Sequence, residues 1–169
     1  MKSGRWLACM LGCLLCLCAA NAAGAQGKKG QKASSAVAVD QGCEPSLWTH
    51  VYNPTRLQKL TPCVSVSGVV EESTADDDGD QHFLLKLDAN QPAGLINKRN
   101  IKKKNGDLVV EIVCANPVRL KKVRSACAGY TNKVPLPKPG DHVRVTGTYV
   151  IDSHNGWAEV HPASRVDQM

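Results

Sequence analysis

Alternating apolar and polar positions mark five segments of the chain as β-strands. The clearest segment is "CVSVSGVVE", residues 63–71, where three valines and a glycine alternate with serines. A period of two residues is typical of a half-buried strand. Short apolar runs with polar flanks predict four more strands. These are His82–Asp88, Leu108–Cys114, His142–Asp152 and a last strand from Trp157 onward.

The segments between the strands carry turn and helix signals. "NPTRLQKL" predicts a short helical turn, with Asn53 as its cap and Pro54 at the first helical position. "SHNG", residues 153–156, predicts a tight hairpin. Residues 116–130 break the strand rhythm and predict a short helix or an irregular crossover. The resulting order is three strands, a helix or crossover and two strands. It predicts a mainly β fold, a small five-stranded OB-like barrel with Gly68 bending a long first strand.

The start of the chain has the layout of a secretory signal. Lys2 and Arg5 precede the apolar run "WLACMLGCLLCLCAA", and small residues lead to a cleavage site after Ala25. Residues 1–25 are therefore predicted to be a signal peptide, and the protein to be periplasmic or secreted. Cleavage before Cys13, by the lipoprotein route, stays open as an alternative.

The rest of the chain divides into an arm and a domain. Residues 26–42 contain "QGKKGQKASS" and are predicted to be a flexible polar arm. Residues 43–169 are predicted to form the β-barrel domain. The apolar run of the signal is too short for a convincing membrane span, so we predict no transmembrane segment.

Cysteine usage changes once the signal is removed. Four of the eight cysteines lie in residues 1–25, which leaves Cys43, Cys63, Cys114 and Cys127. An even number in an exported chain predicts two disulfides. Of the three pairings we favour Cys43–Cys63 and Cys114–Cys127, because these cysteines are nearest in sequence. A four-cysteine zinc site is set aside, since no pair has the spacing of a zinc knuckle.

The charge pattern argues against a nucleic-acid partner. The formal charge is +6, and losing Lys2 and Arg5 leaves 19 Lys and Arg against 15 Asp and Glu. These charges are segregated into acidic and basic stretches and do not form a uniformly basic surface. Aromatic residues are scarce at 4%, although OB surfaces that bind single strands need stacking platforms.

Several stretches together resemble a known group of proteins. "CVSVSGVV", "DGDQHFLLKLD", "LVVEIVC", "GDHVRVTGTYVID" and "HNGWAEVHP" cover much of the predicted domain. They are similar to small secreted bacterial proteins with an OB-like barrel and a terminal His-Gly-Trp, Glu-Ile-His-Pro type motif. The chain departs from the pattern by Asn155, inserted between His154 and Gly156, and by Val160 in place of isoleucine. The resemblance implies a fold and no established activity.

Polar side chains on two predicted strands form a candidate site. Residues two apart on a strand point to the same face, so Trp157, Glu159 and His161 lie together. If that face meets His82 and the preceding turn, imidazole and carboxylate groups could bind a metal ion. Such a site predicts a metal-dependent hydrolase acting on phosphodiesters or esters. The tentative binding set is Asp80, His82, His154, Trp157, Glu159 and His161.

A structural interpretation explains the same residues without a site. Trp157 would lay its ring over apolar side chains at the barrel mouth, and Glu159 and His161 would bond to neighbouring backbone or strands. "DDDGD" (76–80) and "KRNIKKKNGD" (98–107) are then solvated loops. Since no catalytic motif occurs, we assign no catalytic residue and no cofactor. We favour a monomeric binding or structural module of unknown ligand over the hydrolase.

Overall fold

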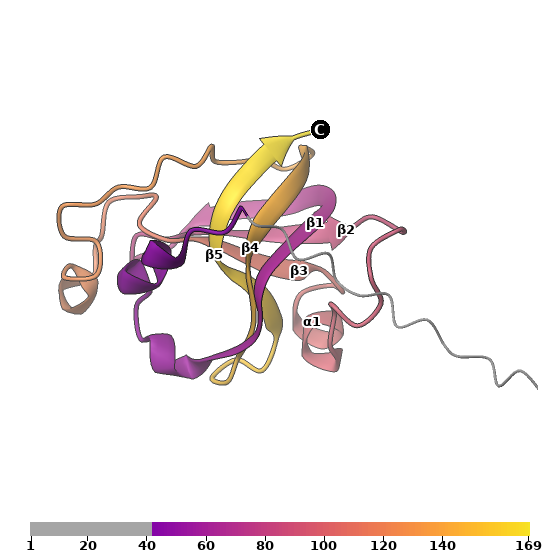
Figure 1. Cartoon of the computed structure of the whole chain (residues 1–169), viewed down its shortest axis with the longest axis horizontal. Coiled ribbons are helices and arrows are strands. Elements are labelled where there is room, and N and C mark those ends of the chain that lie inside the picture. Colours follow the sequence, from indigo (N-terminus) through magenta and orange to yellow (C-terminus); the bar gives the residue numbers. More distant parts are fainter. Residues whose placement is uncertain (1–41) are drawn as a thin grey trace, which may run out of the picture. The chain divides into compact units, whose positions relative to one another are not determined.

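Five β-strands form the framework of the protein in a computed structural model that describes residues 42–169 (Figure 1). The predicted signal peptide and all but the last residue of the predicted arm lie outside the described residues. The strands are β1 (Leu57–Ala75), β2 (Gln81–Leu87), β3 (Leu108–Ile112), β4 (His142–Asp152) and β5 (Ala158–Gln168). The five predicted strands and the mainly β class are confirmed.

The strands close into a ring in the order β1-β2-β3-β5-β4. All neighbouring strands are antiparallel except β3 and β5, which run parallel. The ring closes because β1 is long enough to pair with β4 along its first part and with β2 along its second. A closed ring leaves few strand edges open for pairing with other chains.

Gly68 lies where β1 passes from one partner to the other. It is paired with Leu87 of β2 and with Val143 of β4. A Cβ atom at this position would lie 2.2 Å from the carbonyl oxygen of Lys86, much closer than any van der Waals contact allows. The position therefore needs a residue without a side chain, because the neighbouring backbone approaches closely.

The main apolar core fills the inside of the ring. It takes alternate residues from each strand, as the period of two predicts. Examples are Leu108, Val110 and Ile112 of β3 and Ala158 and Val160 of β5, all of them buried. The residues between them point to the opposite, outer face of the ring.

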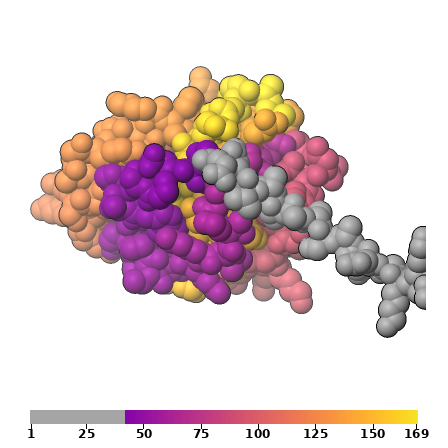
Figure 2. Space-filling model, viewed as in Figure 1, coloured from indigo at the N-terminus to yellow at the C-terminus, as the bar shows by residue number. Residues whose placement is uncertain are grey.

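That outer face is covered by two parts of the chain. One is the segment before β1, residues 42–56, which we call the covering segment, and the other is the connection between β3 and β4, residues 113–141. The segment contains two 3-10 helices, η1 (Pro45–His50) and η2 (Pro54–Arg56). In Figure 2 its indigo surface lies beside the orange surface of the connection. His50 stacks on Tyr130 with 3.9 Å between ring centres. The two segments thus bury the outer face of the strands beneath them.

Both predicted disulfides are present, one between the segment before β1 and the ring and one within the connection that follows β3. Cys43–Cys63 joins the start of the described chain to β1. Cys114–Cys127 closes a loop within the connection that follows β3. The predicted pairing is confirmed.

Three local predictions need correction or refinement. Residues 98–107 are not a loop throughout, because α1 (Lys98–Lys103) forms there with a capping box between Asn97 and Asn100. The helical turn predicted from Asn53 is only the three residues of η2, after which the chain enters β1. The connection from β3 to β4 is an irregular crossover with one short 3-10 helix, η3 (Lys121–Val123).

Across residues 42–169, no helix has the length and apolar character needed to span a membrane.

Replacing Gly68 with alanine tests the closure of the ring. We expect G68A to lower the free energy of unfolding by about 3 kcal/mol, because the new Cβ forces β1 and β2 apart. Urea denaturation followed by circular dichroism measures the change. Gln58→Ala, at an exposed position of the same strand, is the control and should change stability little. Equal stability of the two variants would contradict this account of Gly68.

Candidate functional site

Charged side chains are buried together on the outer face of β3 and β5. Glu111 comes from β3, and Glu159 and His161 come from β5. Their exposed fractions are 7%, 0% and 0%. The sequence alternation explains the placement, since these residues lie between positions that point into the main core. Burying charged groups is costly unless they are paired with each other.

His161 is the centre of this cluster. Its Nδ1 lies 3.0 Å from Oε2 of Glu111 and 3.2 Å from Oε1 of Glu159. Nδ1 therefore carries a proton that it donates to these carboxylates. The other ring nitrogen, Nε2, is buried and has no hydrogen-bond partner among the described residues. It lies 4.0 Å from Oδ2 of Asp80.

Asp80 is buried, which corrects the prediction that all of "DDDGD" is a solvated loop. Asp76 and Asp77 are exposed, but the exposed fraction of Asp80 is only 3%. The backbone amide of Cys114 donates a 2.8 Å hydrogen bond to Oδ1 of Asp80. This bond holds the carboxylate beneath the turn, with its second oxygen directed at His161.

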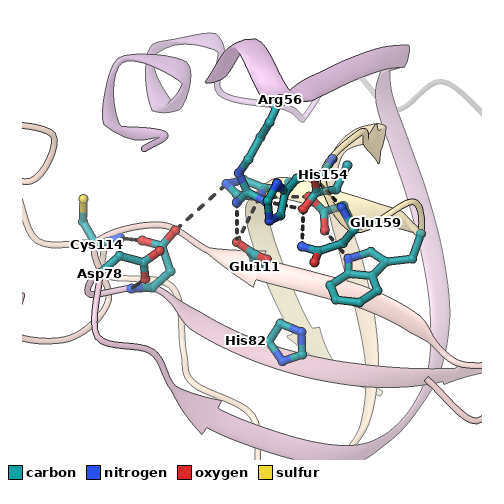
Figure 3. Close-up of polar contacts among 12 residues, drawn as sticks. Arg56, Asp78, His82, Glu111, Cys114, His154 and Glu159 are labelled. Atoms are coloured by element: carbon teal, nitrogen blue, oxygen red, sulfur yellow. Dashed lines mark hydrogen bonds and ion pairs between the residues drawn. The ribbon is translucent and has the colours of Figure 1, made fainter. Parts of the chain in front are cut away.

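Arg56 supplies the positive charge on the side of the covering segment. It lies at the end of η2, where its guanidinium group pairs with Asp152 and lies 3.8 Å from Glu111. Figure 3 shows the contacts that converge between Arg56, Glu111 and Glu159, with His82 to one side. The covering segment thus contributes a charge that the buried carboxylates need.

The cluster shifts the pKa values of its members in opposite directions. Burial alone lowers the pKa of His161, but the charges of Glu111 and Glu159 outweigh it and raise the pKa to about 10. Burial raises the pKa of Asp80 to about 7, against the attraction of His161. For Glu111, burial is outweighed by His161 and Arg56, so its pKa falls below the usual range. Burial raises the pKa of Glu159. His161 is therefore protonated at neutral pH when only these groups surround it.

A polar pocket of about 660 Å³ lies over the cluster. Glu111 forms part of its wall and so belongs both to the pocket and to the buried cluster. Basic, acidic and aromatic side chains line the pocket together. They include Tyr52, Asn53, Arg56, Glu72, Thr74, Asp76, Asp78, His82, Lys104, Lys122, His154, Asn155 and Trp157.

Trp157 lies at the wall of this pocket in a half-buried position. Its Nε1 donates a 2.9 Å hydrogen bond to Oε2 of Glu159. Nζ of Lys104 lies 4.2 Å from the centre of the indole ring, which makes a cation-π contact. The ring therefore contacts a charged group in the pocket, which the purely apolar packing predicted for it did not include.

The six predicted residues fall into two sets in the structure. Asp80, Glu159 and His161 gather in the buried cluster, where Glu159 and His161 bond to each other. The remaining three line the pocket: His82, His154 and Trp157. His82 comes from β2, where it is paired with Glu111, and burial lowers its pKa.

Sequence reasoning missed two residues that the cluster needs. Glu111 is the only charged residue in the apolar run "LVVEIVC", which was a usable signal. Arg56 was read only as part of a helical turn. Nothing in its surroundings along the chain indicated that it meets Asp152, almost a hundred positions later.

The cluster includes a donor set that suits a divalent cation. A ring nitrogen of His161 and one oxygen each of Asp80 and Glu111 lie within 4.8 Å of one another. Imidazole and carboxylate groups are common ligands of zinc and manganese. A second grouping, Asp80 with Cys114 and Cys127, does not suit a cation because both sulfurs are in a disulfide.

Comparison of the chain with protein-family models, with curated proteins and with solved structures gives no match. The site is therefore interpreted from its own geometry.

The first prediction from this site concerns Arg56. Replacing it with methionine keeps much of its length but leaves Asp152 without its cation and Glu111 with His161 alone. We expect R56M to lower the free energy of unfolding by about 3 kcal/mol, as for other broken buried ion pairs. The same substitution at Arg119, which pairs with Asp77 on the surface, is the matched control. It should cost less than about 1 kcal/mol, and similar losses would show that Arg56 is not needed by the cluster.

The second prediction concerns pH and His161. The folded pKa of about 10 lies above the ordinary 6.5, so protonation of His161 stabilises the fold fully below pH 6.5. This contribution is lost as pH rises through 10. The stability difference between the wild type and His161→Gln, measured with a chelator present, should shrink by a few kcal/mol over this range.

Denaturation curves at several pH values test this expectation. His154→Gln, at the exposed end of the last hairpin, is the control and should follow the pH dependence of the wild type. A wild type whose advantage over His161→Gln stays constant from pH 6.5 to 10 would contradict a buried imidazolium.

Proposed function

We propose that this protein is an exported, disulfide-stabilised OB-like module that binds a small polar molecule in the pocket over the buried cluster. The observation that carries the proposal is the pocket itself. Its volume of about 660 Å³ falls in the range of small-molecule sites. Its polar groups come from β1, β2, β3, the covering segment and the last hairpin.

The balance of charge in the pocket favours an uncharged ligand. Arg56 is paired with carboxylates, and Lys104 and Lys122 lie over the rings of Trp157 and Tyr52. These cations face four acidic residues of the lining, Glu72, Asp76, Asp78 and Glu111. An anionic ligand would be repelled by the acidic residues, and a cationic ligand would be repelled by the basic residues.

A hydroxyl-rich molecule fits such a lining best. Each hydroxyl group can donate to a carboxylate and accept from an ammonium or amide group. Trp157 and Tyr52 also line the pocket, and the parts of their rings that the lysines leave uncovered offer apolar contact to the carbon face of a sugar ring. OB-type barrels are also known to bind oligosaccharides with their loops and strand faces. We therefore propose a mono- or disaccharide as the ligand class.

The strand order supports the OB-like part of the proposal. A five-stranded ring in the order β1-β2-β3-β5-β4, with a crossover from β3 to β4, agrees with that fold. The export part rests on the predicted signal peptide. Two disulfides in a small domain are compatible with an oxidising compartment.

Saccharide binding can be tested by NMR with a panel of mono- and disaccharides. We expect at least one sugar to shift the indole N–H signal of Trp157 in a saturable way. Trp157→Phe should weaken that sugar about tenfold, or about 1.4 kcal/mol, because the smaller ring offers less contact area and no longer donates to Glu159. Inorganic phosphate and acetate form the anion arm of the panel and should not shift this signal.

Trp48→Phe is a matched control. Trp48 also donates from Nε1 to a side chain, Thr148, and carries a lysine, Lys59, over its ring, but it lies outside the pocket. It should leave the affinity unchanged. Equal weakening by both variants, or saturable binding of the anions alone, would contradict the proposal. Turnover of phosphodiesters or esters that a chelator abolishes would instead support a metal-dependent hydrolase.

A further inference from the structure

The buried cluster contains a nitrogen that no described group satisfies. The His161 ring is fully buried, and its Nε2 has no hydrogen-bond partner in residues 42–169. Buried polar atoms without a partner are rare because each one costs free energy. The nearest group is Oδ2 of Asp80 at 4.0 Å, which is too long for a hydrogen bond.

The 4.0 Å between Nε2 of His161 and Oδ2 of Asp80 is short enough for one ion to bridge the two atoms. Zinc lies about 2.1 Å from a histidine nitrogen and about 2.1 Å from a carboxylate oxygen. Two ligands of one zinc ion thus stand about 3.4 Å apart at the tetrahedral angle and at most about 4.2 Å apart, so a shift of about 0.6 Å brings these two atoms to tetrahedral spacing. Glu111 now contacts Nδ1 at 3.0 Å, and it can be a third ligand once its carboxylate turns, since one oxygen each of Asp80 and Glu111 and a ring nitrogen of His161 lie within 4.8 Å of one another.

The Nδ1 side of the His161 ring already has the kind of hydrogen bond that a metal-binding histidine makes. A histidine that binds a metal through one nitrogen usually donates its other N–H to a carboxylate, which fixes the ring and its tautomer. Glu159 accepts from Nδ1 at 3.2 Å and is held in turn by the indole of Trp157. Glu159 can therefore hold the ring while Glu111 turns toward an ion.

The charges of the cluster also leave room for a cation. Four carboxylates, those of Asp80, Glu111, Asp152 and Glu159, surround Arg56 and His161. A divalent ion that replaces the second proton of His161 would bring the total positive charge closer to the negative. Glu111 lines the pocket together with Asp76 and Asp78, so one member of the donor set borders a space that other acidic groups also line.

We infer that Asp80, Glu111 and His161 form a binding site for one divalent transition-metal ion, zinc or manganese, beneath the polar pocket. His161 binds through Nε2, Asp80 through Oδ2, and Glu159 positions the histidine from the other side. This inference does not depend on the saccharide proposal, because Asp80 and His161 lie outside the pocket lining, which Glu111 alone shares, and because its probe is the metal alone.

Titration calorimetry on purified, chelator-treated protein with both disulfides intact tests the site. We expect Zn²⁺ or Mn²⁺ to bind with one ion per chain. Asp80→Asn should abolish this binding, and it preserves an oxygen that can accept from the Cys114 amide. Glu159→Gln should weaken the affinity about 10- to 100-fold, as expected for a group that orients a ligand.

Asp77→Asn is the control for the acidic turn. Asp77 belongs to the same turn as Asp80 but is exposed, so this variant should bind like the wild type. Circular dichroism checks that each variant is folded. Mn²⁺ added to the unmodified protein supplies a measurement without mutation. It should broaden the NMR signals of the His161 ring well before those of His142, which pairs with Asp88 at the other end of β4.

Several results would overturn the inference. Folded protein that binds neither ion would show that Nε2 of His161 is satisfied in another way, for example by a buried water. Undiminished binding by folded Asp80→Asn, or equal loss in Asp77→Asn, would place the ion on the exposed turn. Preferential broadening of His142 would also reject the site.

Discussion

Charge burial on the outer face of β3 and β5 is the constraint on which the rest of this structure depends. A strand that turns a glutamate or histidine away from the main core would normally expose it to water. Here Glu111, Glu159 and His161 are covered instead, so each must find a partner within the protein. The covering segment supplies Arg56, and the turn before β2 supplies Asp80. The segments outside the ring are therefore part of the charge balance as well as of the packing.

The ring itself was predictable from the sequence because its signals are local. Strand alternation, the Asn-Gly hairpin and the spacing of four cysteines are read within a few residues of each position. The buried cluster was predictable only in part, since it depends on which face of a strand another segment covers. Asp80 illustrates the difference. It belongs to an acidic run typical of solvated turns. It is nevertheless buried, because its carboxylate accepts from the Cys114 amide after β3 and lies near the His161 imidazole of β5. Glu111 could have been found as a lone charge in an apolar strand, whereas Arg56 could not.

Glu111 links the two candidate sites, because its side chain borders the pocket and contacts His161 below it. A ligand that draws this carboxylate into the pocket would take it from His161, and an ion that draws it inward would change the pocket wall. A ligand in the pocket and an ion in the cluster would therefore compete for the Glu111 carboxylate. By linkage, each would then alter the affinity of the other by the same factor.

Cys114 joins the disulfide framework to this chemistry. Its backbone adopts the left-handed conformation, with φ of 52°, which is unfavourable for a residue with a side chain. The disulfide to Cys127 and the hydrogen bond from its backbone amide to Asp80 together hold it in this conformation. The disulfide therefore restrains the same residue whose backbone amide holds the Asp80 carboxylate. A chain whose Cys114 and Cys127 are reduced lacks this restraint, so the redox state of the two cysteines bears directly on where the Asp80 carboxylate lies.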